Sequence, residues 1–222
     1  KTLGTDYIDV LYTHWQCKTY GLVPVAETMG ELMNLKQEGK IRAIGASNVD
    51  LKILQEYVEA GQLDVIQEKL SILDRKPEET LLPFCEAHGV SLQTYSPIEQ
   101  GLLAGKIPND YVLPEGSARL GKLWWKPENI PLVNQMLDSW RALADKYGCS
   151  LANLAIKWNS MLSPSIHVLC GARKLAQIED TARSLEVPRF DCPLYLMLIP
   201  AVWRKNQRKG SHSNETISIY HH

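Results

Sequence analysis

Short β-rich runs alternate with amphipathic helical segments along most of this chain, and this alternation limits the possible folds more than any other feature. The five predicted strands are residues 7–15, 40–48, 63–67, 90–96 and 165–170. Several segments between them end at glycines that suit a helix C-terminus, such as Gly39, Gly61 and Gly89. Because strands separated by single helices run in the same direction, the pattern predicts a parallel α/β sheet that is buried on both faces.

The helical segments and one long irregular interval complete this pattern. The predicted helices are residues 25–38, 50–60, 77–88, 132–147, 150–160 and 175–185. The interval 97–131 is rich in Gly, Pro and Trp, which predicts a functional loop, and its adjacent Trp124 and Trp125 indicate packing rather than disorder. The alternation fits an open doubly wound sheet or a closed barrel. No GxGxxG follows the first strand, which disfavours the dinucleotide-binding open sheet.

Composition and charge exclude several classes of protein. The 24 basic and 25 acidic side chains give a net charge of −1, without the basic surplus that nucleic acid as a main partner requires. No run reaches the roughly 18 apolar residues that span a bilayer, and the apolar run 194–203 contains Pro200. The five cysteines are widely spread without a CxxC pair, and the spacing of His14 and Cys17 lacks a second ligand pair. We therefore expect reduced thiols, a cytoplasmic location and no metal site.

Side chains at the carboxyl ends of the predicted strands form the candidate site, because parallel sheets and barrels bind ligands there. They are His14, Ser47 and Asn48, Gln67, Tyr95 and Ser96, and the segment 171–173. The set contains no carboxylate pair, which disfavours glycosidase and two-metal chemistry. It suits a nicotinamide dinucleotide, because its amides and hydroxyls can bind a carboxamide and its tyrosine can stack on a flat ring. Glycine and arginine at a helix start can hold a phosphate.

Each of these residues also has a structural explanation when it is taken alone. His14 is then an interior histidine and Tyr95 a packing residue, while Ser47 and Asn48 form the N-cap of the following helix. Arg173 is then a solvated residue at a helix start. A cap residue can also face a ligand, so the two interpretations of the pair Ser47 and Asn48 are compatible.

Several longer segments resemble the aldo-keto reductase superfamily in their order and spacing, over residues 1–187. These are LGTDYIDVLYTHW, EGKIRAIGASN, LDVIQ, LLPFCEAHGV, TYSPIEQGLLAGK, and GAR followed by Gln177. The likeness is to bacterial and yeast-type reductases related to potassium-channel β-subunits. It implies a (β/α)8 barrel of the TIM type, of which strands four to eight are present, and NADPH-dependent reduction of a small aldehyde or ketone to an alcohol. Residues 188–222 lack the family's usual C-terminal pattern, and we expect an atypical, loosely ordered tail.

The resemblance assigns one catalytic residue of this chain, His14, which matches the histidine of the family's Asp, Tyr, Lys and His tetrad. The other three positions lie before Lys1, so we expect an N-terminally truncated chain that is inactive by itself. The family's Tyr is the general acid, and its Lys and Asp lower the pKa of that Tyr, so His14 cannot replace them. A non-catalytic NADPH-binding regulatory protein of the channel β-subunit kind is the alternative. An unrelated phosphate-binding parallel barrel is a third possibility.

The resemblance also implies the residues that bind the cofactor. They are Ser47, Asn48 and Gln67 at the carboxamide, Tyr95 on the ring, Ser96, Pro97, Ile98 and Gln100 along the pyrophosphate, Lys106 and Arg119 as further phosphate contacts, and Gly171, Arg173, Gln177, Asp180 and Thr181 at the adenosine end. Arg173 would favour NADPH over NADH through the 2′-phosphate, while Thr181 replaces the family's usual Asn. Neither the physiological carbonyl nor the oligomeric state follows from the sequence.

Overall fold

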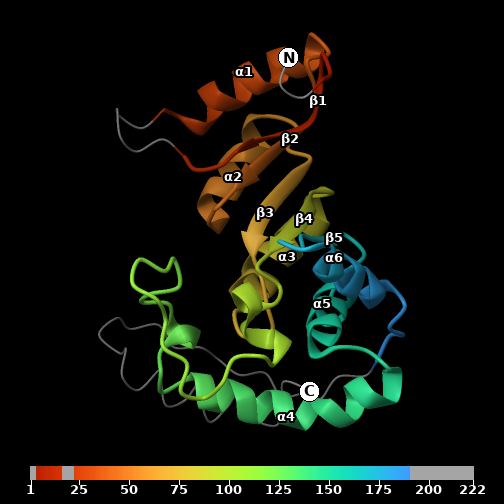
Figure 1. Ribbon diagram of the computed structural model, residues 1–222. Helices are drawn as coiled ribbons and strands as arrows, with labels where there is room; N and C mark the ends of the chain where they lie inside the picture. Colours follow the sequence, from red (N-terminus) through yellow and green to blue (C-terminus); the bar gives the residue numbers. More distant parts are fainter. Residues whose placement is uncertain (1–3, 17–22, 191–222) are drawn as a thin grey trace.

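A five-stranded parallel sheet runs through the computed structural model, which describes residues 4–16 and 23–190 (Figure 1). Its strands are β1 (Ile8–Thr13), β2 (Ile41–Ser47), β3 (Val65–Lys69), β4 (Ser91–Tyr95) and β5 (Ile166–Val168). They lie side by side in chain order, and every neighbouring pair is parallel. A doubly wound sheet reverses its strand order at a switch point, whereas this sheet winds in one direction as a barrel wall does. The predicted parallel sheet is confirmed, and the strand order favours the barrel.

In the described part of the chain, six α-helices connect and follow the strands, within a few residues of the predicted bounds. They are α1 (Val25–Gln37), α2 (Leu51–Ala60), α3 (Lys76–His88), α4 (Ile130–Tyr147), α5 (Leu151–Met161) and α6 (Leu175–Ala182). The predicted helix 175–185 is wrong in its last turn, because the chain tightens there into the 3₁₀ turn η3 (Arg183–Leu185).

The start of α2 corrects one interpretation of the sequence. The Asp50 carboxylate accepts a hydrogen bond from the backbone N–H of Ile53 at 2.9 Å, so Asp50 is the N-cap. The interpretation of Ser47 and Asn48 as that cap is therefore wrong. Ser47 ends β2 and Asn48 follows it directly, which leaves both side chains available to the edge of the sheet.

The first hydrophobic core lies between the sheet and the helices α1, α2 and α3. Its fully buried members include Met29, Ile44, Leu54, Ile66 and Leu92. The residues that alternate with the core residues along the strands include Tyr12, Gln67 and Gln93, which are only partly buried. The sequence predicts that both faces of the sheet are buried, and this prediction is wrong for the polar face. In a sheet that winds in one direction, all the connecting helices cover the same side.

A second core gathers the segments after β4. It includes Leu102, Trp140 and Leu154, together with Trp124 and Trp125, which are 6% and 2% exposed. The predicted long loop contains two 3₁₀ helices, η1 (Glu99–Ala104) and η2 (Leu123–Trp125), and the predicted packing of its tryptophans is confirmed. In Figure 1, α4 lies across the end of the molecule opposite β1.

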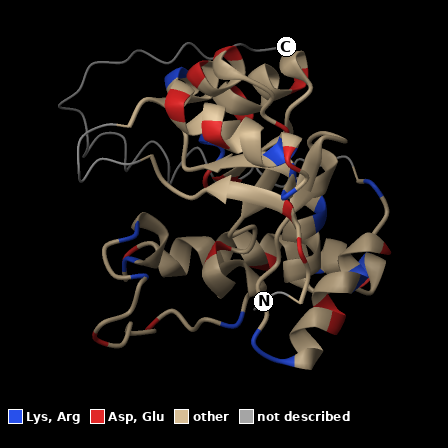
Figure 2. Ribbon diagram, turned by 90° about the horizontal axis from the view of Figure 1, so that it is seen from above, with Lys and Arg blue, Asp and Glu red and all other residues tan. Residues whose placement is uncertain are grey.

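Charged side chains and cysteines are distributed over the described part of the chain. Figure 2 shows the Lys and Arg positions as separate short segments rather than one continuous stripe. Cys85, Cys149 and Cys170 are free thiols. Within residues 4–16 and 23–190, no helix combines the length and apolar character that crossing a membrane requires, and no group of three His, Cys, Asp or Glu side chains could hold a metal ion.

Candidate active site

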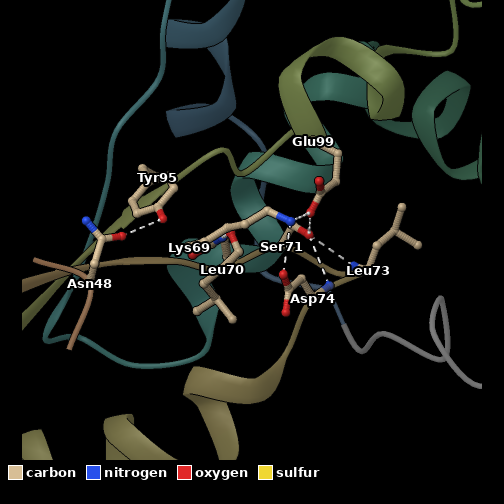
Figure 3. Close-up of polar contacts among 9 residues, drawn as sticks. Asn48, Lys69, Leu70, Ser71, Leu73, Asp74, Tyr95 and Glu99 are labelled. Carbon is tan, nitrogen blue, oxygen red and sulfur yellow. Dashed lines mark hydrogen bonds and ion pairs between the residues drawn. The ribbon is translucent and has the colours of Figure 1, made fainter. Parts of the chain in front are cut away.

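Asn48 joins three strand ends into one cluster at the carboxyl edge of the sheet. Its Nδ2 donates to the backbone carbonyl of His14 at 2.9 Å, and its Oδ1 accepts from the Tyr95 hydroxyl at 3.0 Å (Figure 3). The backbone of Asn48 has a φ of 58°, a left-handed conformation that Asn tolerates better than most residues. The structure thus brings together residues that follow or end β1, β2 and β4.

Ser47 and Gln67 are adjacent in this cluster but bind mainly to the protein. The Ser47 hydroxyl donates to the backbone carbonyl of Gln67 at 2.8 Å, and the same oxygen accepts from Asn48 Nδ2 at 3.2 Å. Gln67 Nε2 donates to Gln93 Oε1 at 2.7 Å. The same Gln93 oxygen also accepts from the Tyr12 hydroxyl at 2.8 Å. The hydroxyl proton of Ser47 is therefore committed inside the sheet, while Gln67 keeps a second N–H.

Sequence reasoning missed Tyr12 and Gln93, although the strand pattern contains a signal for both. Tyr12 precedes His14 by two residues, and Gln93 precedes Tyr95 by two. Residues two apart in a strand share a face, so both belong to the polar face that leads to the site. The candidate site therefore continues along this face of the sheet rather than stopping at the strand ends.

The side chains of His14 and Tyr95 present two rings at the strand ends. His14 is exposed beyond β1, and its imidazole makes no hydrogen bond to any described residue, while its ring lies 6.2 Å from that of Trp15. Tyr95 is half-buried, and burial is the main cause that raises the pKa of its hydroxyl. At neutral pH the Tyr95 hydroxyl is therefore protonated and donates to Asn48, which fixes the orientation of the ring.

The segment after Tyr95 has a strained backbone. Ser96, Glu99 and Gln100 have φ values of 56°, 47° and 55°, which side chains with a Cβ rarely adopt. Pro97 is buried, Ile98 packs against the second core, and Gln100 Oε1 is buried without a hydrogen-bond partner among the described residues. Backbone strain of this kind concentrates at ligand-binding sites, so these outliers support a functional role for the loop.

Three of the residues predicted at the adenosine end, Gly171, Arg173 and Gln177, lie before α6 or in its first turn. A hydrogen bond of 2.8 Å from the Leu169 N–H to the Thr94 carbonyl holds the segment after β5 beside β4. Gln177 Oε1 accepts from the backbone N–H groups of Arg173 at 2.7 Å and Lys174 at 3.2 Å. Gly171 is exposed, and the exposed Arg173 guanidinium makes no hydrogen bond or ion pair to the described part of the chain.

Asp180 and Thr181 are engaged within the protein. The Asp180 carboxylate accepts from the Ser150 hydroxyl at 3.0 Å, and the Asp180 carbonyl accepts from Asn153 Nδ2 at 2.6 Å. The Thr181 hydroxyl donates to the Gln177 carbonyl at 2.9 Å. Asp180 binds the start of α5, and Thr181 lies in the last turn of α6. Their predicted contacts with adenosine therefore require side-chain atoms that these hydrogen bonds leave free.

Lys106 and Arg119 are not connected to the strand-end cluster. Lys106 is exposed, and the Arg119 guanidinium lies over the Trp125 ring at 4.5 Å from its centroid. Within residues 4–16 and 23–190, no hydrogen bond joins either side chain to the cluster around Asn48. Their predicted phosphate contacts remain predictions.

Glu68 supports the cluster from the side of the helices, and sequence reasoning missed it. Its Oε1 accepts from the Val49 backbone N–H at 2.6 Å, directly after Asn48. Burial raises the pKa of this carboxyl to about 7, although the backbone N–H groups of Val49 and Asn48 lower it in part. The signal that could have drawn attention to it is a carboxylate two residues after Ile66, on the face of the strand that packs against the helices.

Glu68→Gln is expected to remove a pH dependence of folding stability. The raised pKa means that the folded chain binds a proton that the unfolded chain has already released, so stability falls as pH rises from about 4.5 to 7. An amide keeps the acceptor for Val49 without a charge, so the variant is expected to be more stable at pH 8 by roughly 2–3 kcal/mol. Urea unfolding across this pH range measures the effect, and an unchanged slope would contradict it.

Comparisons with known proteins agree with this geometry. The aldo/keto reductase family model matches residues 1–192. The chain belongs to the aldo/keto reductase family. It is 46% identical over 195 residues to the NADH-specific methylglyoxal reductase of Escherichia coli strain K12, covering 88% of this chain and 59% of that protein. It is 33% identical over 183 residues to an aldo-keto reductase of Bacillus subtilis, covering 81% and 54%.

Solved structures of the family show the same fold. A glycerol dehydrogenase from Gluconobacter oxydans matches with a TM-score of 0.77 at 26% identity, covering 98% of this chain and 64% of that one. An aldo-keto reductase from Klebsiella pneumoniae, solved with NADPH, matches with a TM-score of 0.63 at 23% identity, covering 89% and 60%. The chain thus spans a little more than half the length of its relatives. Its five strands form part of a (β/α)8 barrel, and an unrelated barrel is excluded.

Proposed function

We propose that this chain is the cofactor-binding part of a nicotinamide-dependent reductase that converts aldehydes or ketones to alcohols. The observation that carries the proposal is the hydrogen-bonded cluster at the strand ends, in which Asn48 binds the Tyr95 hydroxyl and the Ser47 hydroxyl, and Ser47 in turn binds the backbone carbonyl of Gln67. Membership of a family whose enzymes bind a nicotinamide cofactor supports it. The cluster offers a flat ring and several amides, which suit a nicotinamide and its carboxamide.

The hydrogen-bonding capacity of the cluster fits a carboxamide. Both N–H groups of the Asn48 amide are used, by the His14 carbonyl and by Ser47 Oγ, while its Oδ1 keeps a lone pair beside the one that accepts from Tyr95. The second N–H of Gln67 is a donor. Asn48 would therefore accept from the carboxamide nitrogen and Gln67 would donate to the carboxamide oxygen. The bound dinucleotide supplies the hydride.

His14 is the residue of this chain that we place at the substrate carbonyl. Its exposed imidazole follows β1 at the same edge as Tyr95, where it can orient a carbonyl oxygen. The family resemblance assigns proton donation to a tyrosine outside this chain, so we propose that the 222 residues bind cofactor without turning over substrate. Methylglyoxal, which the E. coli relative reduces according to its name, is the first carbonyl to assay.

Loss of nicotinamide absorbance in the presence of methylglyoxal tests this proposal. We expect turnover from a chain extended upstream by the family's first three strands and none above background from the 222 residues alone. His14→Ala in the extended chain is expected to lower kcat while leaving the dinucleotide affinity within about threefold, because His14 contacts substrate rather than cofactor. Equal turnover by the short and extended chains would contradict the placement of the proton donor.

The preference between NADPH and NADH is proposed to depend on Arg173. Its guanidinium is exposed and free of partners in the described residues, so it can pair with a 2′-phosphate, although the E. coli relative is named as NADH-specific. Arg173→Ala is expected to weaken NADPH binding about tenfold while changing NADH affinity less than threefold. Titration of the tryptophan fluorescence with each dinucleotide measures both, with Arg183→Ala, at the opposite end of α6, as control. Equal effects on the two dinucleotides would overturn the preference for NADPH.

A further inference from the structure

An ionic network around the buried Glu99 joins the end of β3 to the strained loop after β4 (Figure 3). The Glu99 side chain is 2% exposed, and its Oε1 lies 3.0 Å from Lys69 Nζ and 2.5 Å from Ser71 Oγ. Lys69 Nζ also lies 2.9 Å from Asp74 Oδ2, on the far side of the ammonium group. Glu99 therefore has partners from β3 and the turn that follows it, although it lies itself in η1.

The charged state of this network follows from its surroundings. Burial by itself lowers the pKa of Lys69, but Glu99 and Asp74 outweigh it, so the pKa is raised overall and the ammonium is charged. A buried carboxylate without a partner costs several kcal/mol, which Lys69 and Ser71 offset here. A well-packed apolar pair in the same place is often as stable as a buried ion pair. Stability alone therefore does not explain why this position holds charged side chains.

The position of Glu99 in the loop indicates what the network contributes instead. Glu99 and Gln100 are consecutive residues with left-handed backbones, and Ser96 is a third within the same five residues. Such a backbone is strained for a residue with a Cβ, and it persists only where surrounding contacts over-determine it. The ion pair anchors the side chain of a residue whose own backbone is strained. Releasing that side chain would allow the loop to relax to an ordinary backbone.

We propose that Glu99 is a positioning residue, whose carboxylate, held by Lys69 and Ser71, keeps loop 96–101 in the left-handed conformation that receives the cofactor pyrophosphate. The inference rests on the proposed function, because it names that cofactor as the ligand of the loop. It assigns no contact between Glu99 and the cofactor. Its effect passes through the backbone of Ser96 and Gln100.

The two carboxylates around Lys69 provide a matched comparison. Glu99→Gln keeps the shape and a hydrogen-bonding group for Ser71 but removes the charge that pairs with Lys69. Asp74→Asn removes a charge from the same ammonium group at 2.9 Å, but Asp74 lies outside the loop. If Glu99 positions the loop, Glu99→Gln weakens dinucleotide affinity about tenfold and Asp74→Asn changes it less than threefold.

A double variant separates positioning from loss of stability. Lys69→Met leaves the buried Glu99 carboxylate without its cation and is expected to weaken affinity at least as much as Glu99→Gln. In Lys69→Met/Glu99→Gln the unpaired charge is gone, so the affinity is expected to be no lower than in the Lys69→Met single variant. A role limited to stability predicts instead that all three variants, measured under conditions where they are folded, bind the dinucleotide as tightly as the unsubstituted chain.

The experiment combines dinucleotide titration with hydrogen exchange of backbone amides in the 222-residue chain without cofactor. We expect Glu99→Gln to accelerate exchange in residues 96–105 while leaving β2 and α2 unchanged, and Asp74→Asn to accelerate neither. Equal effects of the two variants, or a uniform acceleration throughout the chain, would overturn the inference. If the unsubstituted chain binds neither NADPH nor NADH, the proposed function fails. The exchange pattern still decides whether Glu99 holds the loop.

Discussion

Asn159→Ala is expected to destabilise the chain by about 3 kcal/mol, because it removes a buried amide that joins α5 to β4 and to Leu70, directly after β3. Asn159 is fully buried; its Nδ2 donates to the Leu70 carbonyl at 2.7 Å, and its Oδ1 accepts from the Thr94 hydroxyl at 3.0 Å. Without the amide, a carbonyl and a hydroxyl remain buried and unpaired. Urea unfolding followed by circular dichroism measures the loss.

The same helix provides a control for this substitution. Ser160 is exposed, and its hydroxyl donates only to the Lys157 carbonyl, so Ser160→Ala is expected to change stability by less than about 0.5 kcal/mol. Adding Thr94→Val to Asn159→Ala is expected to cost less than Thr94→Val alone, because the hydroxyl has already lost its partner. A loss below about 1 kcal/mol for Asn159→Ala would show that water or a rearranged partner satisfies these groups.

Asn159 also shows which parts of the structure the sequence predicts. Local periodicity predicts α5 around it, because that signal depends on residues three and four positions apart. Its partner Leu70 lies 89 residues away, and no local pattern indicates that a polar residue in an apolar helix reaches that carbonyl. The same holds for the pair of Lys69 and Glu99, whose contact depends on how the turns after β3 and β4 pack.

The sequence predicts which residues meet at the strand ends of the candidate site, and there is a physical reason for this. Parallel strands end at one edge of a sheet, so residues at successive strand ends lie close together without knowledge of any side-chain contact. That is why Asn48 and Tyr95 are predicted together and form a hydrogen bond in the structure. Their roles toward a cofactor remain predictions. The strand pattern indicates the face on which Gln93 and Glu68 lie, but their hydrogen-bond partners depend on pairing register and packing, which only the folded chain defines.

Gly45→Ala is expected to disturb the polar face of the sheet by steric conflict alone. A Cβ at Gly45 would lie 2.4 Å from Tyr12 Cδ1 and 2.5 Å from Cε1, so the ring must move. The Tyr12 hydroxyl shares Gln93 Oε1 with the Gln67 amide, and a displaced ring gives up that bond. We expect a loss of about 1–3 kcal/mol of stability from overpacking, together with a several-fold loss of dinucleotide affinity, because Gln93, which holds the Gln67 amide, loses its bond to Tyr12.

A second glycine and a second substitution make this prediction specific. Gly30 lies on the exposed side of α1 with no atom within 4 Å of its Cβ position, so Gly30→Ala is expected to stabilise the helix by up to about 1 kcal/mol. Tyr12→Ala removes the ring that a Cβ at Gly45 would meet, so adding Gly45→Ala to Tyr12→Ala is expected to cost little further stability. Equal losses from Gly45→Ala with and without the Tyr12 ring would show that the conflict lies elsewhere. If Gly30→Ala raises the stability and Gly45→Ala lowers it, the loss at Gly45 comes from close contact with the Tyr12 ring. The lost conformational freedom of a glycine backbone would then not explain it.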